Sequence, residues 1–101
     1  MPKQVRGVYL DQATLDLAKE AAWQRRISLS ELFRAGKASF LAEPDITGWG
    51  EVPPSGKGRF SVVIDGDEWN ALKDAAWERH LNLSEAVRLI LKHESETETS
   101  Q

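Results

Sequence analysis

An internal repeat constrains the fold of this chain more than any other feature of its sequence. Without a gap, the run AAWQR at 21–25 aligns with AAWER at 75–79, and LSE at 29–31 aligns with LSE at 83–85. Other coinciding positions are Val8 with Val62, Asp11 with Asp65, Lys19 with Lys73 and Arg34 with Arg88. Because the unit occurs only twice, a duplicated unit that closes on itself is favoured over a solenoid.

Each copy begins with a pattern typical of a short strand. In residues 59–64, Phe60, Val62 and Ile64 alternate with residues that would point to the other face. This period of two predicts a half-buried strand. Residues 5–10 occupy the matching positions of the first copy, so we predict a strand there as well.

Two helices follow the strand in each copy. Asp11 and Asp65 stand where a side-chain oxygen would cap the first N–H groups of a helix. The segments 28–31 and 82–85 each pair an oxygen-bearing residue with a glutamate three positions later, the pattern of a capping box. We therefore predict first helices at 12–25 and 67–79 and second helices at 29–42 and 83–94.

A single copy of about 36 residues is too small to bury a core, and its lone strand has an unpaired edge. Antiparallel pairing of the two strands, with the second helices crossing over them, solves both problems. The equivalent positions of the second helices are matched in size, large against small: Leu32 with Ala86, Phe33 with Val87 and Gly36 with Ile90. A homodimer of one copy would instead place glycine against glycine or isoleucine against isoleucine. We predict a mainly α fold with a two-stranded antiparallel β-ribbon, formed within one chain as an intramolecular pseudo-dimer.

The expected organisation is one fused domain over residues 1–101. Copy one spans 4–42, a linker 43–57, copy two 58–94 and a tail 95–101. The linker contains proline and glycine and is typical of a loop. The tail is polar and acidic, so we expect it to be disordered.

Each copy resembles the ribbon-helix-helix (Arc/MetJ/CopG-like) family of DNA-binding proteins, and the chain resembles its tandem, single-chain form. The resemblance covers about 72 of the 101 residues. It implies sequence-specific binding of double-stranded DNA, with the β-ribbon in the major groove, where base edges are distinguishable.

The strand residues that alternate with the core positions are the candidates for reading bases. They are Val5, Gly7 and Tyr9 in copy one and Arg59, Ser61 and Val63 in copy two. Arg59 could donate two hydrogen bonds to a guanine, Ser61 could bond several bases, and a valine could contact a thymine methyl group. Gly7 would allow close approach of the backbone. Because the two strands differ, we expect a non-palindromic site.

A second set of candidates would hold phosphate. Free N–H groups and the positive end of the helix dipole favour anions at the starts of the second helices, although ordinary capping explains the same residues. The candidates there are Ser28, Leu29, Ser30, Asn82, Leu83 and Ser84. The cationic candidates are Arg25, Arg26, Arg79, Lys3 and Lys57.

Charge and composition limit the other possibilities. The net charge is −3, and residues 1–93 are formally neutral, so DNA affinity must come from local placement of cations. There is no cysteine and no apolar run long enough to cross a bilayer, so we expect a cytoplasmic protein without membrane contact. His80 and His93 are isolated. We expect no enzymatic activity, cofactor, metal or small-molecule substrate.

The most direct interpretation is a transcriptional repressor, with self-association of pseudo-dimers on DNA. The alternatives are an accessory protein of a plasmid relaxosome or partition system, and an antitoxin-like protein-interaction module that uses the acidic tail or the loop around Trp49. Trp23 and Trp77 are predicted to pack on the core or its edge, and Trp49 is predicted to cover the core.

Overall fold

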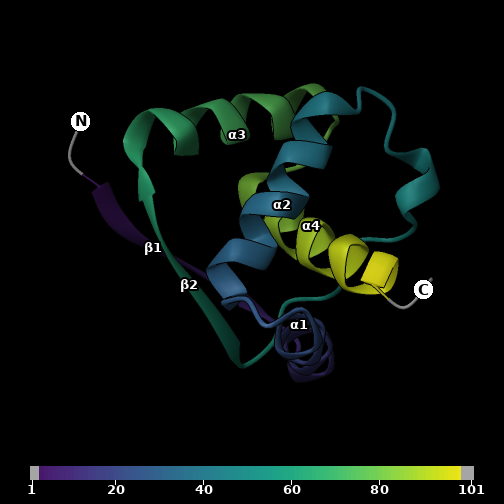
Figure 1. Cartoon of the computed structure of the whole chain (residues 1–101). Coiled ribbons are helices and arrows are strands. Elements are labelled where there is room, and N and C mark those ends of the chain that lie inside the picture. The colour runs from purple at the N-terminus through teal and green to yellow at the C-terminus, as the bar shows by residue number, and fades with distance from the viewer. Residues whose placement is uncertain (1–2, 99–101) are drawn as a thin grey trace.

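The computed structural model describes residues 3–98 and contains, within that range, four α-helices and one two-stranded antiparallel sheet. The elements are β1 (Lys3–Leu10), α1 (Gln12–Arg25), α2 (Leu29–Ala42), β2 (Gly58–Asp65), α3 (Gly66–Glu78) and α4 (Leu83–Glu98), with a 3₁₀ turn at Thr47–Trp49 (Figure 1). The prediction of a mainly helical fold with an antiparallel ribbon is confirmed.

At the centre of the ribbon, the two strands pair at equivalent positions of the repeat. Gly7 pairs with Ser61, and these two residues occupy equivalent positions in the two copies. A slip of one residue would turn every side chain to the opposite face, so this register fixes which residues are buried. The buried residues on the inner face are Val8, Leu10, Phe60, Val62 and Ile64.

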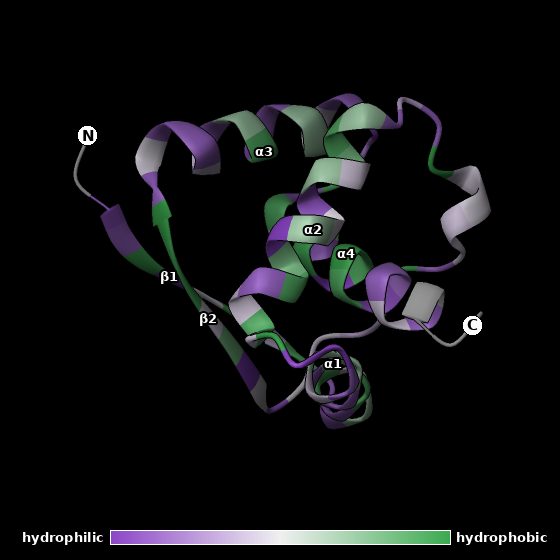
Figure 2. Cartoon of the chain, viewed as in Figure 1, coloured by the Kyte–Doolittle hydropathy of each residue, from purple (hydrophilic) through white to green (hydrophobic). Residues whose placement is uncertain are grey.

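The helices lie on the side of the ribbon that its buried inner face points to. In Figure 1, α2 and α4 cross at the centre, with α3 on one flank and α1 on the other. Figure 2 shows hydrophobic residues where α2 and α4 meet and along part of β2. The Phe33 ring of α2 lies 5.2 Å from the Phe60 ring of β2, so the core joins the two copies.

The expected size matching between α2 and α4 is confirmed at Gly36. A Cβ atom added to Gly36 would lie 2.7 Å from Cγ2 of Ile90 and 3.2 Å from its carbonyl oxygen. The glycine therefore allows the two helices to approach as closely as they do, because a larger residue would meet atoms already there.

The linker closes over one side of the core. Trp49 is buried, stacked on His93 at 3.7 Å between ring centroids and edge-on to Phe40 at 5.7 Å. The prediction that Trp49 covers the core is confirmed.

The predicted disordered tail is wrong over residues 95–98, because α4 continues to Glu98. Ser95 is fully buried, and its hydroxyl donates to the Leu91 carbonyl at 2.6 Å. This bond satisfies the serine within its own helix, so a polar residue can extend the buried face. The rest of the predicted tail, 99–101, lies outside the described residues.

Candidate nucleic-acid interface

All six candidates for base reading lie on the exposed outer face of the ribbon. The exposed fraction is 66% for Val5, 56% for Tyr9 and 49% for Val63. The register brings the six together as three cross-strand pairs: Val5 with Val63, Gly7 with Ser61 and Tyr9 with Arg59. The face therefore has an aliphatic end, a centre of small residues and an end with a cation beside an aromatic ring.

Gly7 leaves room on the outer face of the ribbon for the Arg59 side chain. A Cβ atom added there would lie 2.8 Å from Nε of Arg59 and 2.9 Å from its Nη2 atom. The guanidinium carbon also lies 6.0 Å from the centroid of the Tyr9 ring. Arg59 therefore extends along the ribbon over Gly7, and it is the arginine side chain that occupies the space left by the glycine.

The predicted capping boxes are present at both second helices. At α2, Oγ of Ser28 accepts from the Glu31 N–H at 3.0 Å, and the Ser28 N–H donates to Glu31 at 2.9 Å. At α4, Asn82 and Glu85 make the same two bonds, at 2.8 and 2.9 Å. The N–H groups of the next two residues of each helix have no partner within a helix and remain available to an anion.

The capping glutamate adds a negative charge at the start of α2. The backbone N–H of Ser28, and then its hydroxyl, hydrogen-bond to Glu31 and lower the pKa of its carboxyl group from its ordinary value. Glu31 is therefore ionised at neutral pH. Its negative charge would repel a phosphate placed at this helix end.

The turns between the paired helices have the same backbone geometry in both copies. Arg26 and His80, which occupy equivalent positions of the repeat, have φ values of 60° and 62° in the left-handed region. Ile27 N donates to the Ala22 carbonyl at 3.0 Å, and Leu81 repeats this bond to Ala76 at 2.9 Å. Both Arg26 and His80 are exposed. Because glycine or asparagine would adopt this conformation at lower cost, the side chains found here suggest a role on the surface.

Arg25 and Arg79, two of the predicted phosphate contacts, have partners within the protein. Arg25 forms an ion pair with Glu94 at 2.5 Å and also donates to the Glu94 carbonyl at 3.1 Å. Arg79 donates to the Glu43 carbonyl at 2.8 and 3.1 Å and lies over the Phe40 ring at 4.8 Å. Each guanidinium thus links the C-terminal end of the first helix of one copy to the C-terminal part of the second helix of the other.

The remaining cationic candidates are exposed. Lys3 is at the start of β1 and pairs across the ribbon with Asp65, and Lys57 immediately precedes β2. Together with Arg26 and Arg59, they are the predicted cations whose side chains are exposed.

Two repeated arginines, to which the sequence assigned no role, hold the ribbon and the linker. Arg34 of α2 donates to the Val63 carbonyl at 2.7 Å, near the end of β2. Its equivalent, Arg88 of α4, donates to the Pro53 carbonyl of the linker at 2.8 Å. Their recurrence at equivalent positions of the two copies was the signal that could have indicated a structural role.

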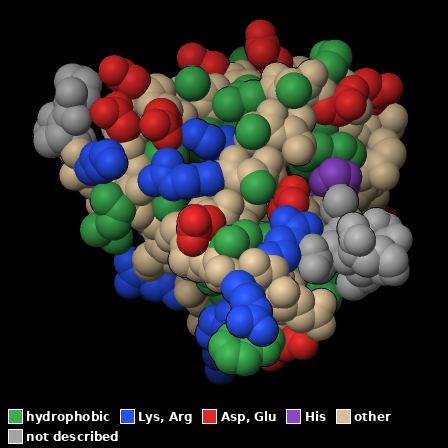
Figure 3. All heavy atoms as spheres, viewed as in Figure 1, with side chains coloured by type: hydrophobic (Ala, Val, Ile, Leu, Met, Phe, Trp, Pro, Cys, Tyr) green, Lys and Arg blue, Asp and Glu red, His purple; other side chains and the backbone are tan. Residues whose placement is uncertain are grey.

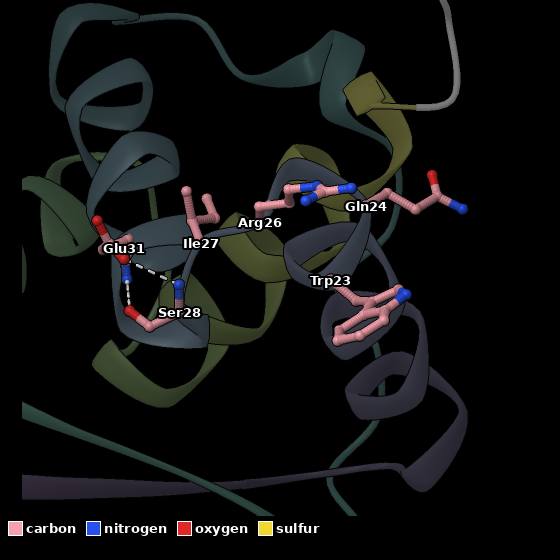
Figure 4. A pocket seen from close by; sticks show the side chains of 6 residues that line it. All are labelled: Trp23, Gln24, Arg26, Ile27, Ser28 and Glu31. Carbon is pink, nitrogen blue, oxygen red and sulfur yellow. Dashed lines mark hydrogen bonds between the residues drawn. The ribbon is translucent and has the colours of Figure 1, made fainter.

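The predicted packing of Trp23 and Trp77 is wrong. Their exposed fractions are 78% and 80%. In α1 the buried stripe runs through Leu15, Ala18 and Ala22, and Trp23 is one position off it, about 100° around the helix. Figure 4 shows the Trp23 side chain on α1, apart from the bonded pair of Ser28 and Glu31.

Comparison of the chain with protein-family models, with curated proteins and with solved structures finds no match. Within residues 3–98, none of the helices combines the length and the apolar character needed to cross a membrane.

Proposed function

We propose that this chain is a sequence-specific double-stranded DNA-binding protein of the ribbon-helix-helix class, acting as a single-chain pseudo-dimer and most simply as a transcriptional repressor. The observation that carries the proposal is the outer face of the ribbon. The ribbon is two-stranded and antiparallel, and the exposed residues on this face include an arginine, a serine and a tyrosine. A ribbon of this width fits the major groove of B-DNA.

The reciprocal contacts between the copies support the pseudo-dimer. Arg25 contacts residue 94 and Arg79 contacts residue 40, and the repeat relates position 25 to 79 and position 40 to 94. In a two-fold interface, if one position contacts a second, the second also contacts the first. The two contacts keep this geometry although one is an ion pair and the other places a cation over a ring.

Base reading is divided between the two ends of the ribbon. Arg59, once its guanidinium rises from over Gly7, can donate to O6 and N7 of a guanine. At the other end, the paired valines Val5 and Val63 offer a surface for thymine methyl groups. The favoured site is therefore non-palindromic, with a guanine toward one end and thymines toward the other.

Phosphates on either side of the groove would be held unequally. Arg26 stands beside the start of α2, and His80 takes the equivalent place beside α4. Lys3, the first residue of β1, and Lys57, just before β2, add cations at equivalent positions of the repeat. Binding near a promoter would repress transcription by excluding the polymerase from the same DNA.

The substitution Arg59→Ala tests this function. We expect it to reduce discrimination at one base pair by about 1–3 kcal/mol, because a bidentate contact with guanine is lost. The measurement is the affinity of wild type and variant for the duplex selected by the wild type from random DNA and for its single-base variants, at two salt concentrations.

The matched control is Arg26→Ala, which removes a cation outside the ribbon. It should weaken binding to all duplexes about equally and reduce the steepness of the salt dependence by about 0.9 in the log–log slope. If Arg59→Ala leaves the sequence preference unchanged, Arg59 does not read a base. Wild-type binding that is absent, or insensitive to salt, would contradict DNA binding itself.

A further inference from the structure

Gly7 lies in the middle of a strand, at an exposed position where glycine needs a reason. Glycine in a strand interior lowers stability, because it has no side chain to pack and loses more backbone freedom on folding than other residues. Its backbone conformation does not explain it, since Gly50 is the glycine of residues 3–98 that has a positive φ. The reason for glycine at position 7 is therefore the space above it.

The guanidinium of Arg59 occupies this space. A Cβ atom at position 7 would lie 2.8 Å from Nε, 2.9 Å from Nη2 and 3.2 Å from Cζ of Arg59. Arg59 is paired directly with Tyr9, so it reaches Gly7 along the diagonal of the ribbon. Diagonal neighbours in an antiparallel pair are about 7–8 Å apart, within reach of a long side chain. Glycine thus allows the arginine to cross from β2 over β1.

The other half of the ribbon provides a matched comparison. The residue equivalent to Arg59 is Val5. Its diagonal neighbour is Ser61, which is equivalent to Gly7. Valine is too short to cross to the neighbouring strand, and the position that it would cross carries a side chain. Glycine therefore occurs in the half of the ribbon where an arginine lies on the diagonal.

The hydrogen-bond donors of Arg59 are not used within residues 3–98. Figure 3 shows Lys and Arg side chains next to Asp and Glu side chains around the start of α3, where Arg34 and Lys37 form ion pairs with Glu68. Arg59 has no such partner among the described residues. Its contact with Gly7 is one of shape alone, so its planar set of N–H donors remains available to the two acceptors of a guanine.

We propose that Gly7 is a specificity-determining residue of the DNA interface, because it lets Arg59 cross the ribbon and so fixes which base pair the guanidinium reaches. This inference rests on the proposed DNA binding. A side chain at position 7 would take the place of the guanidinium and turn Arg59 away from the diagonal. The protein would still fold, since the displaced atoms are the end of an exposed, flexible side chain. It would bind DNA with the arginine out of position and lose its preference for guanine.

A double-mutant cycle between Gly7→Ala and Arg59→Ala tests the inference. The affinity of each variant is measured for the duplex selected by the wild type and for the same duplex with each guanine replaced in turn. Arg59→Ala should lower the preference for guanine by about 5- to 150-fold at one position, and Gly7→Ala should lower it there by at least about fivefold. The double variant should match Arg59→Ala within about twofold, because the added methyl group acts through the arginine.

Gly48→Ala is the matched control, since a Cβ atom at this linker residue would meet no atom within 4 Å. It should bind every duplex as wild type does. Gly7→Ala should retain the circular dichroism and the thermal unfolding of wild type. A measurement that needs no variant is the nuclear Overhauser effect between the Gly7 Hα protons and the Arg59 side chain in the wild type without DNA. We expect this effect, and its absence would overturn the inference.

The outcomes separate this inference from the proposed function. If the wild type prefers guanine and Gly7→Ala keeps the same preference, the inference fails and the DNA binding stands. If Gly7→Ala weakens binding to all duplexes equally, also in the Arg59→Ala background, Gly7 serves close approach of the backbone to DNA and the inference fails as well. Wild type that binds no duplex would contradict the proposed function and, with it, the role of Gly7.

Discussion

Replacement of Phe33 by alanine is expected to lower the free energy of unfolding by about 3–5 kcal/mol, the cost of removing a large aromatic side chain from a packed core. Phe33 is fully buried in α2, and its ring contacts Phe60 of β2. The substitution removes a contact between the two copies, so it should destabilise the whole molecule in one transition. Urea denaturation followed by circular dichroism measures the change.

The control for Phe33→Ala is Leu41→Ala in the same helix. Leu41 is 41% exposed, so its truncation should change the free energy of unfolding by no more than about 0.5 kcal/mol. A loss at Phe33 as small as the loss at Leu41 would mean that the core does not join the copies as described. Two separate transitions would mean that the copies fold independently.

The second large effect is expected at Gly36. Gly36→Ala should destabilise the protein by about 1–3 kcal/mol, toward the upper end, because the added methyl group meets Ile90 where no space is left. The expected loss of stability is opposite to the effect of helix propensity, which favours alanine over glycine by about 1 kcal/mol. Denaturation of the variant in urea gives the value.

A double-mutant cycle identifies the cause at Gly36. In the double variant Gly36→Ala/Ile90→Ala, the Cγ2 atom that the new methyl group would meet is gone. The free energy of unfolding should therefore fall by less than the sum of the two single-variant losses, by about 0.5–3 kcal/mol. Gly66→Ala is the matched control, because a Cβ atom at the first residue of α3 would meet no atom within 4 Å. Purely additive losses, or an equal loss at Gly66, would contradict close contact between α2 and α4.

Local patterns predicted much of the fold, since they depend on residues close in sequence. The period of two at 59–64 predicted which ribbon residues are buried, and Asp11 and Asp65 do cap their helices as expected. The repeat added the long-range information. Two units too small to fold alone, with strands that each need a partner, predicted the antiparallel pairing.

The sequence did not reveal side-chain partners that lie in the other copy. Arg25 and Arg79 look like free cations near a turn, because nothing local indicates Glu94 or Phe40 as a partner. Glu94 also illustrates why the tail was misjudged. Its acidic surroundings suggest disorder, but an ion pair with α1 and the buried Ser95 extend the helix.

The exposed tryptophans were misjudged for a different reason. Hydrophobic residues are usually assigned to the core, yet in both copies the small alanines at 21, 22, 75 and 76 fill the space beneath α1 and α3. The helical period places Trp23 off the buried stripe. Its position in the helix therefore indicated exposure, whereas its hydrophobic side chain suggested burial.

The central claim is that the outer face of the ribbon contacts DNA. Nuclear magnetic resonance of the labelled chain, titrated with the duplex selected by the wild type, tests it most directly. We predict that the amide signals of β1 and β2, including Gly7, Tyr9, Arg59 and Ser61, shift together with those of the Arg26 turn, while those of the loop around Trp49 do not. A titration in which the ribbon signals stay unchanged, or in which only the linker responds, would contradict the account.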